Sequence, residues 1–331
     1  MDLQVYPQLF EPVYKHMIWG GSKISSEAGL NLKEDELPVG ESWLIADRND
    51  GQTVVSNGPH KGLSLSELIE KHPGKIVSSK HRPGDPFPLI IKIIDAGERL
   101  SLQVHPDEIV ARKYPGSEAK TEMWYVLEHT PGANIYAGLR HDKTQLQFRT
   151  RIGTDKIEEC LQKFPSRDGD AYYIPSGTVH AIGEGNLILE IHQNSNTTYR
   201  VYDWGRVKKD GESRELHVEQ ALDSIHFKDR TLPLIRCDES TITANKKRNL
   251  VRYNKYFNSE ELKIISDFFS NTSSKTFHIL SAVNSSFSVK YNDGVVKVDK
   301  GRSCLLPAAL GAYSILAEDE PLTVIRSMLS M

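Results

Sequence analysis

Two polar residues that lie two positions apart, Gln103 and His105, are the first candidates for chemistry in this chain. On a β-strand, residues i and i+2 point to the same face, so both side chains can look into one interior. His180 follows a turn at Pro175–Gly177 and begins a further predicted strand, from which its imidazole can approach the same point. One amide oxygen and two imidazoles need a carboxylate to complete a divalent site, and Glu122 is the best candidate. Neutral imidazoles with hard oxygen donors suit Zn²⁺ or a similar first-row ion, and the lack of thiolates favours a catalytic site with an open position.

Two charged residues near these positions could take part in proton transfer. Lys120 lies two residues before Glu122, so on one strand the two share a face and Lys120 should border the metal. Glu190 lies on the predicted strand after His180 and is our preferred general base. The alternative is that Glu190 orients His180, as a hydrogen-bond partner of a metal ligand.

Two other polar residues lie in apolar runs. Lys92 sits inside Leu89–Ile94, the most apolar run of the chain and a predicted core strand. Such a lysine either snorkels from an edge or points its cation into a cavity, and the sequence leaves both open. His192 alternates with Glu190, but we expect a hydrogen-bonded structural residue there rather than a fifth ligand.

The elements that must position these residues are mostly strands. Residues 1–23 carry aromatics and prolines without helical spacing, which predicts an extended arm on a larger body. From residue 250 the chain alternates and is predicted to be mostly β, with an Asn-Asp-Gly turn at 292–294. The sequence therefore predicts a mainly β protein with a few short helices.

Short helices interrupt the strands. Residues 65–71 should form one, with Ser64 as N-cap and Glu67 in capping-box register. Another should start at Pro106, because proline is tolerated in the first helical turn.

Two later segments have helical signals as well. Residues 142–164 should contain at least one helix, with Asp155 and Glu158 in capping-box register. Residues 216–227 have helical apolar spacing.

The C-terminal segment echoes the turn that precedes His180. Gly301 and Pro307 repeat the spacing of Gly169 and Pro175, but Ala312 stands where His180 would be. The pattern is short, so chance is an alternative. If the repeat is real, residues 1–237 form a metal-binding domain and 238–331 form a second barrel without a metal, with the polar stretch 238–249 as linker.

Composition excludes several classes of function. The chain has 331 residues and a net charge of −3, which disfavours nucleic-acid binding. No apolar run approaches the ~18 residues of a membrane span, and the first residues do not resemble a secretory signal. Three widely spaced cysteines form neither a metal pattern nor a disulfide framework, so we expect reduced thiols in a cytoplasmic protein.

Several blocks in the first 230 residues closely resemble the type I mannose-6-phosphate isomerases, in their short bacterial branch. The blocks occur in order as IWGG at 18–21, GESW at 40–43, SLQVHPD at 101–107, KTEMWYV at 120–126, IPSGTVHA at 174–181 and TTYRVYDW at 197–204. The last hundred residues match only in general cupin character. The resemblance implies two cupin-like, jelly-roll β-barrels and one bound Zn²⁺.

The resemblance also implies an activity and residues to perform it. The family converts mannose 6-phosphate to fructose 6-phosphate reversibly, an aldose–ketose isomerisation through a cis-enediol. Its metal ligands fall on the four residues that spacing had nominated, and its active-site arginine falls on Arg200, for charge stabilisation or phosphate recognition. Arg200 could instead form a structural ion pair. Ser101, Lys92 and Lys120 could bind the sugar phosphate.

One departure from the family pattern bears on the mechanism. Many relatives carry Asp where this chain has Asn196, and some proposals give that Asp a role in proton transfer. The alternatives to an isomerase are another metal-dependent cupin enzyme and a non-catalytic sugar-binding bicupin. For partners we expect a small sugar phosphate, no nucleic acid, no membrane, and a monomer or weak homodimer.

Overall fold

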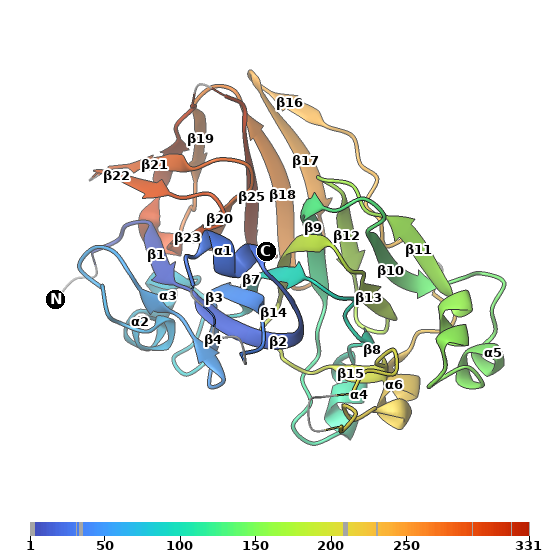
Figure 1. Cartoon of the computed structure of the whole chain (residues 1–331). Coiled ribbons are helices and arrows are strands. Elements are labelled where there is room, and N and C mark those ends of the chain that lie inside the picture. Colours follow the sequence, from blue (N-terminus) through green and yellow to red (C-terminus); the bar gives the residue numbers. More distant parts are fainter. Residues whose placement is uncertain are drawn as a thin grey trace. The chain divides into compact units, whose positions relative to one another are not determined.

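The computed structural model describes residues 4–30, 32, 36–207, 211–229, 231–292, 294–318 and 320–330. The protein is mainly β with short helices and a cupin-like arrangement of strands, as the sequence predicts (Figure 1). The chain divides into two compact units. The central unit comprises Tyr14–Ser42 and Ile93–Ile235, and the terminal unit comprises Met1–Val13, Trp43–Lys92 and Arg236–Met331.

The central unit is built on two sheets, and the strand pairs whose register is described in them are antiparallel. The five-stranded sheet has the order β11 (Leu161–Pro165), β10 (Asn134–Leu139), β13 (His180–Ile182), β8 (Leu102–Val104) and β15 (Tyr199–Tyr202). The six-stranded sheet has the order β12 (Ala171–Ile174), β9 (Glu122–His129), β14 (Asn186–Gln193), β7 (Leu89–Ala96), β2 (Val13–Gly21) and β3 (Val39–Ile45), of which β2, β3 and β7 continue into the terminal unit along the chain.

A hydrophobic core joins the two sheets of the central unit. Ile135 and Ile182 of the five-stranded sheet belong to the same buried cluster as Trp124, Tyr172 and Ile188 of the six-stranded sheet. Alternate residues of each strand face this interior, because the side-chain period of a strand is two. The inward positions that do not belong to this core are therefore available for a site.

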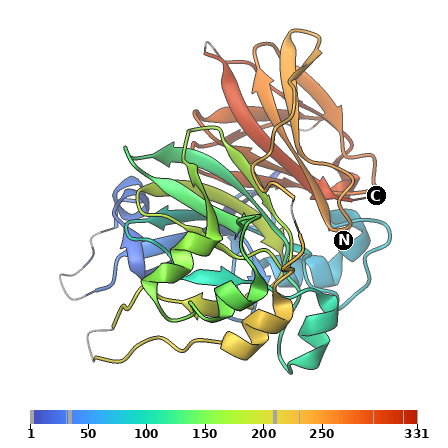
Figure 2. The same ribbon diagram turned by 90° about the vertical axis from the view of Figure 1, so that its right-hand side faces the viewer.

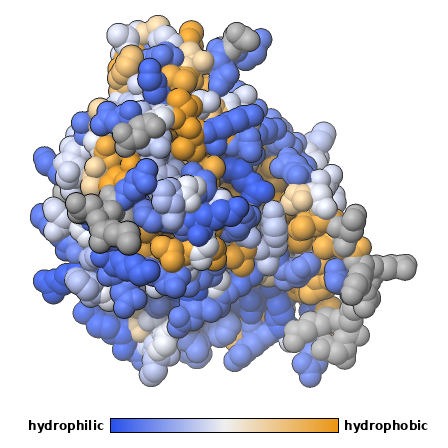
Figure 3. Space-filling model, turned by 90° about the vertical axis from the view of Figure 1, so that its left-hand side faces the viewer, coloured by the Kyte–Doolittle hydropathy of each residue, from blue (hydrophilic) through white to orange (hydrophobic). Residues whose placement is uncertain are grey.

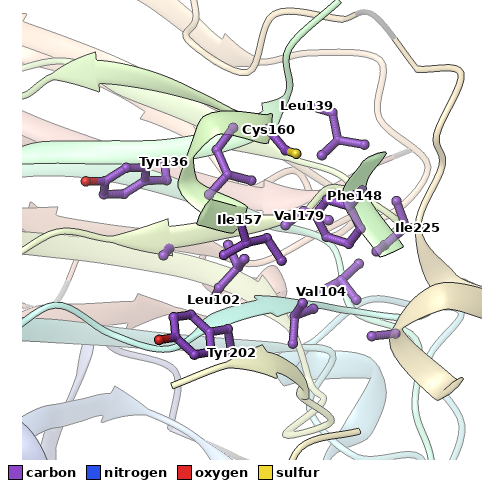
Figure 4. Close-up of a cluster of buried hydrophobic side chains, with 14 of the residues drawn as sticks. Leu102, Val104, Tyr136, Leu139, Phe148, Ile157, Cys160, Val179, Tyr202 and Ile225 are labelled. Carbon is purple, nitrogen blue, oxygen red and sulfur yellow. The ribbon is translucent and has the colours of Figure 1, made fainter. Parts of the chain in front are cut away.

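Helices cover the other face of the five-stranded sheet. They are α4 (Glu108–Lys113), α5 (Gln145–Arg149), the 3₁₀ helix η1 (Asp155–Cys160) and α6 (Val218–Ser224). Leu102 and Val104 of β8 are fully buried in this second cluster, together with Phe148 of α5 and Ile157 of η1 (Figure 4). The views in Figures 1 and 2 show α4 beside α6 at one end of the unit. Burial of Leu102 and Val104 on this side fixes Gln103 on the opposite, inward side of β8.

The terminal unit also contains two sheets. The eight-stranded sheet has the order β16 (Ser240–Ile242), β17 (Asn245–Val251), β18 (Phe257–Ile264), β25 (Leu322–Leu329), β20 (His278–Ala282), β23 (Ser303–Leu306), β1 (Gln8–Glu11) and β6 (Val54–Val55). The four-stranded sheet has the order β19 (Phe268–Asn271), β24 (Ala312–Ile315), β21 (Phe287–Tyr291) and β22 (Gly294–Val298). A small ribbon, β4 (Asp47–Arg48) with β5 (Gly51–Gln52), and the helices α2 (Leu65–Lys71), α3 (Pro73–Ile76) and η2 (Ala308–Leu310) complete the unit, while α1 (Lys23–Glu27) belongs to the central unit.

The local pattern of the sequence repeat is visible in the terminal unit. Gly169 and Gly301 both have positive φ angles, 81° and 71°, and β12 and β23 follow them at the same spacing. Ala312, the counterpart of His180, begins β24 as His180 begins β13. The predicted turn at 292–294 joins β21 to β22 through Tyr291 paired with Gly294, although its residue 293 lies outside the described residues.

Some local predictions were right and others wrong. The Ser64–Glu67 capping box is present, with Glu67 N donating to Ser64 Oγ at 3.2 Å and Ser64 N to Glu67 Oε2 at 2.8 Å. The box predicted at Asp155 and Glu158 is wrong, because Asp155 accepts from Tyr202 Oη instead.

Three corrections to the predicted local structure follow from the same comparison. In the 142–164 segment, the capping box belongs to α5 and consists of Thr144 and Gln147. The helix predicted at Pro106 begins at Glu108, with Asp107 as its N-cap. The stretch 238–249 is not a linker, because most of it forms the hairpin β16–β17.

The surface and the cysteines agree with a globular protein of this composition. In the part of the chain that the structure describes, no helix is both long and apolar enough to cross a membrane. Hydrophobic residues reach the surface in patches among hydrophilic ones (Figure 3). All three cysteines are free, with Cys160 and Cys304 buried and Cys237 exposed.

Candidate active site

Three predicted metal ligands converge in the interior of the central unit. His105, Glu122 and His180 each offer one ligand atom, and these atoms all lie within 4.8 Å of one another. Each of the three residues is only 1% exposed. They come from positions 17 and 58 residues apart along the chain, so strand pairing rather than local structure brings them together.

Strand register explains the convergence. Gln103 of β8 pairs with His180 of β13 on one side and with Arg200 of β15 on the other. Directly opposed residues of antiparallel strands project to the same face, so the three side chains form a row across the five-stranded sheet. Glu122 begins β9 in the other sheet, where it pairs with His192 of β14.

Each imidazole is oriented by a backbone carbonyl. His105 Nδ1 lies 2.8 Å from Thr197 O, and His180 Nδ1 lies 2.8 Å from Thr178 O. A carbonyl oxygen can only accept, so Nδ1 carries the proton in both rings and Nε2 presents a lone pair. Trp124 packs edge-on against the His180 ring, with centroids 5.3 Å apart.

The atoms that face one another would repel without a cation. His105 Nε2 lies 3.3 Å from Glu122 Oε2, and His180 Nε2 lies 3.3 Å from Glu122 Oε1. Within the described residues, His105 Nε2 and Glu122 Oε1 make no hydrogen bond. Buried lone pairs that face a buried carboxylate fit a bound divalent ion, which all of them could coordinate.

Gln103 can supply the fourth ligand atom. Its Nε2 lies 3.2 Å from His180 Nε2, and its Oε1 accepts from Ser101 Oγ at 3.3 Å. Rotation of the terminal amide by 180° exchanges its two atoms. Oε1 would then face the ligand cluster, and Nε2 could donate to the Ser101 hydroxyl, which both donates and accepts.

Burial keeps both imidazoles neutral. Desolvation lowers the pKa of His105 to about 3, with the Lys120 charge acting in the same direction and Glu122 opposing it. Desolvation also lowers the pKa of His180. For Glu122, burial alone would raise the pKa, but the charge of Lys120 holds it well below the usual range. Neutral imidazoles and an ionised carboxylate are the forms that bind a metal.

Lys120 joins two buried carboxylates. Its Nζ lies 2.7 Å from Glu122 Oε2 and 3.0 Å from Glu190 Oε1. Burial opposes the charge of Lys120, but Glu122 and Glu190 together raise its pKa above the ordinary value. Lys120 is 5% exposed and Glu190 is 2% exposed, so the predicted proton-transfer residues lie together beside the ligand cluster.

Glu190 and His192 have identifiable neighbours. Glu190 contacts Lys120, and its Oε1 also lies 3.4 Å from His192 Nε2. His192 Nδ1 is 2.7 Å from the Gln193 carbonyl oxygen, which agrees with a hydrogen-bonded structural role. The described contacts thus tie Glu190 to Lys120 and His192.

Arg200 and Asn196 occupy less buried positions. Arg200 is partly buried, and its Nη1 donates to Glu215 O at 2.8 Å, while its Nε makes no hydrogen bond in the described part of the chain. Asn196 is exposed, and its backbone N lies 3.3 Å from Glu118 Oε2. Lys92 is buried in the segment of β7 that belongs to the terminal unit.

Comparison with known proteins identifies the family. Residues 8–138 match the family model described as the catalytic domain of type I phosphomannose isomerase. The crystal structure of the mannose 6-phosphate isomerase from Bacillus subtilis is similar over 98% of this chain and 99% of that chain, with a TM-score of 0.86 and 32% identity. The chain belongs to the type I phosphomannose isomerases. It is therefore an enzyme, and its fold is that of this family.

Other members of the family are similar as well. Mannose-6-phosphate isomerase ManA of Bacillus subtilis is 41% identical over 220 residues, which are 66% of this chain and 68% of that protein. The mannose-6-phosphate isomerase of Streptococcus mutans is 42% identical over 206 residues, 62% of this chain and 63% of that protein. The phosphomannose isomerase of Salmonella typhimurium shares the fold, with a TM-score of 0.74 at 13% identity.

Some parts of this phosphomannose isomerase site were missed by the sequence analysis. The Thr178 and Thr197 carbonyls that orient the histidines leave no trace in residue type, because every residue has a carbonyl. The ion-paired cluster of Asp203 and Arg214, which lies beside Arg200, was also missed. The only signal for it was the charged character of the segment after Arg200.

Proposed function

We propose that this chain interconverts mannose 6-phosphate and fructose 6-phosphate through a cis-enediol, with one Zn²⁺ ion per chain. The observation that supports it best is the buried set of His105, Glu122 and His180 beside the Lys120–Glu190 ion pair. The relatives named as mannose-6-phosphate isomerases support the same substrate.

Gln103, His105, Glu122 and His180 would hold the ion. Two neutral nitrogens, a carboxylate oxygen and an amide oxygen are a ligand set that zinc accepts, and they leave room for a further oxygen ligand. When bound, the ion would polarise the substrate carbonyl and stabilise negative charge on the sugar oxygens.

Glu190 is the proposed base for the carbon-bound proton. The isomerisation removes a proton from C2 and returns one to C1, while a second proton moves between O1 and O2. Glu190 is buried and held by the Lys120 ammonium at 3.0 Å, so a proton acceptor is fixed in one orientation beside the ligand cluster. Seclusion from water prevents the proton from being lost during the transfer.

Lys120 and Arg200 are the proposed cationic groups. Lys120 can donate to a sugar oxygen and accept the proton back, since it lies between the base and the ligand Glu122. Arg200 shares the inward face of Gln103, and its Nε, which has no hydrogen-bond partner among the described residues, supports recognition of an anionic oxygen, including that of the phosphate. Ser101, which hydrogen-bonds to Gln103, and Lys92 are further proposed substrate-binding residues.

A coupled assay for fructose 6-phosphate tests this proposal. The purified enzyme should convert mannose 6-phosphate, lose activity after chelation, and regain it with one equivalent of Zn²⁺. Metal analysis on the same samples should give one ion per chain. A chain that stays fully active without metal would contradict the zinc proposal, and one that binds metal but converts no mannose 6-phosphate would contradict the substrate.

A further inference from the structure

We infer that Asp203 is a positioning residue, which holds Arg200 in its inward orientation through Arg214. The inference rests on the proposed function, because it concerns the arginine to which that proposal gives a role in turnover. Asp203 itself lies one residue beyond the end of β15 and is 4% exposed.

Arg200 is hydrogen-bonded to the segment 211–217 at its guanidinium and at its backbone. Its Nη1 donates to Glu215 O at 2.8 Å, and its backbone N donates to His217 Nδ1 at 3.2 Å. The backbone N of His217 donates in return to Arg200 O at 2.8 Å. Most of residues 211–217 are exposed, so contacts outside the segment must keep it in place.

Arg214 supplies such a contact. It lies directly before Glu215, and its Nε donates to Asp203 Oδ2 at 2.8 Å while its Nη2 donates to Asp203 Oδ1 at 2.5 Å. A two-point contact between a guanidinium and a carboxylate fixes direction as well as distance. Two hydrogen-bonded contacts therefore link Asp203 to Arg200. Asp203 binds the Arg214 guanidinium, and the carbonyl of the adjacent Glu215 binds the guanidinium of Arg200.

The position of Asp203 is itself constrained. Arg206 Nη2 donates to Asp203 Oδ1 at 2.7 Å. The next residue, Trp204, has a φ angle of 59°, which is uncommon for a bulky residue. Its indole Nε1 donates to Leu100 O at 2.6 Å, and the Arg99 guanidinium lies 3.4 Å from the centroid of its ring. These contacts hold the turn after β15 in an unfavourable conformation, which is typical of a functional site.

The charge of Asp203 is a second reason to assign this residue a positioning role. Arg206 and Arg214 both donate to its buried carboxylate, and the charges of the same two arginines act on Arg200. Burial alone would raise the pKa of Asp203, but hydrogen bonds from Arg214 and Arg206 lower it, so the carboxylate stays ionised. Without that charge, Arg214 and Arg206 would repel Arg200 and the segment that carries Glu215 would lose its anchor.

A double-mutant cycle tests the inference. Four proteins are compared in the holoenzyme form, with mannose 6-phosphate as substrate: the wild type, Asp203→Asn, Arg200→Ala and the double variant. We expect Asp203→Asn to lower kcat by up to about 10²-fold through misplacement of Arg200, with the metal content unchanged. The double variant should be no slower than Arg200→Ala alone, because both changes remove the same contribution.

Two further variants separate positioning from stability. Arg214→Lys keeps the charge but loses the two-point contact, so it should reproduce the kcat loss of Asp203→Asn even if the latter folds poorly. Glu260→Gln is the matched control, since it also removes a buried carboxylate partner of an arginine, Arg326. This control lies in the terminal unit and should lower the melting temperature without lowering kcat.

The outcomes distinguish the inference from the proposed function. The inference about Asp203 would be overturned, and the proposed function left intact, by either of two results. One is that the kcat losses multiply in the double variant, and the other is that Asp203→Asn and Arg214→Lys both keep the wild-type kcat. A fully active Arg200→Ala would remove the role of Arg200 together with this inference. A wild type that converts no mannose 6-phosphate would overturn the proposed function itself.

Discussion

Replacement of Lys120 by methionine should strongly destabilise the metal-free protein. The ammonium of Lys120 lies 2.7 Å from Glu122 and 3.0 Å from Glu190, and all three residues are buried. At an effective dielectric constant of ~20, each contact corresponds to about 6 kcal/mol of attraction, which is offset by the cost of burying the charges. Removal of one partner from such a buried group costs about 3–5 kcal/mol, because two uncompensated carboxylates remain.

On the same grounds, the stability difference between Lys120→Met and the wild type should change with pH. Without Lys120, one of the two carboxylates should take up a proton in the folded state, so its pKa rises above the unfolded value. A raised carboxyl pKa makes the folded state bind more protons, so Lys120→Met should gain stability relative to the wild type as the pH falls from 7 towards 5. The slope for one group is at most about 1.4 kcal/mol per pH unit.

Urea unfolding of chelator-treated protein at pH 7 and pH 5.5, followed by tryptophan fluorescence, measures both effects. Lys163→Met is the control, since Lys163 is half-exposed and contacts Glu158 at 3.3 Å, and its loss should change stability by no more than about 1 kcal/mol. A loss below about 1 kcal/mol for Lys120→Met, or a deficit that does not narrow at lower pH, would refute the reasoning.

Three other predictions concern the ligand set, the base and the terminal unit. His180→Ala should lose bound metal and activity together, as measured by metal analysis and the coupled assay; a metal-free variant with full activity would refute its role as a ligand. Asn196→Asp should change kcat little, since Asn196 is exposed, whereas a large rise with a new acidic limb in the pH profile would move the base from Glu190 to this position. Burial is the main cause, and the Arg326 charge the second, that lowers the pKa of His278 to about 3. Between pH 3 and 6.5 the unfolded state therefore binds more protons than the folded state, so the stability of the folded state falls as the pH drops below 6.5. His278→Asn, which can keep a polar atom near Tyr313, should weaken that acid sensitivity by up to about 1.4 kcal/mol per pH unit in urea unfolding, and an unchanged dependence would contradict it.

Glu190 illustrates which features of the site residue spacing along the sequence could predict and which it could not. Its place on a strand after His180 made it a candidate, but spacing left open whether it would orient His180 or act as a base. The structure ties it to Lys120 at 3.0 Å and sets His192 beside it at 3.4 Å. These contacts depend on the register of β9 against β14. A shift of that register by one residue would turn the side chains of one strand to the other face of the sheet.

The capping boxes show the same limit of sequence-based prediction on a smaller scale. Ser64 and Glu67 form theirs because both partners lie within one turn of the chain. Asp155 and Glu158 have the same spacing, but Tyr202 engages Asp155, while Glu158 accepts from Arg99 and Tyr136. A local motif is therefore reliable only where tertiary partners do not take its side chains.

The sequence by itself determined the ligand candidates, because the two-residue period of a strand puts Gln103 and His105 on one face and a turn delivers His180 to the start of another strand. Its motif blocks determined the family as well. Only the tertiary structure decided that Glu122 lies 3.3 Å from both imidazoles, that the Thr178 and Thr197 carbonyls orient them, and that Asp203 anchors the segment against Arg200. The physical reason is that these contacts join residues whose separation in space is set by strand pairing and by the burial of apolar faces, which residue spacing along one strand does not contain.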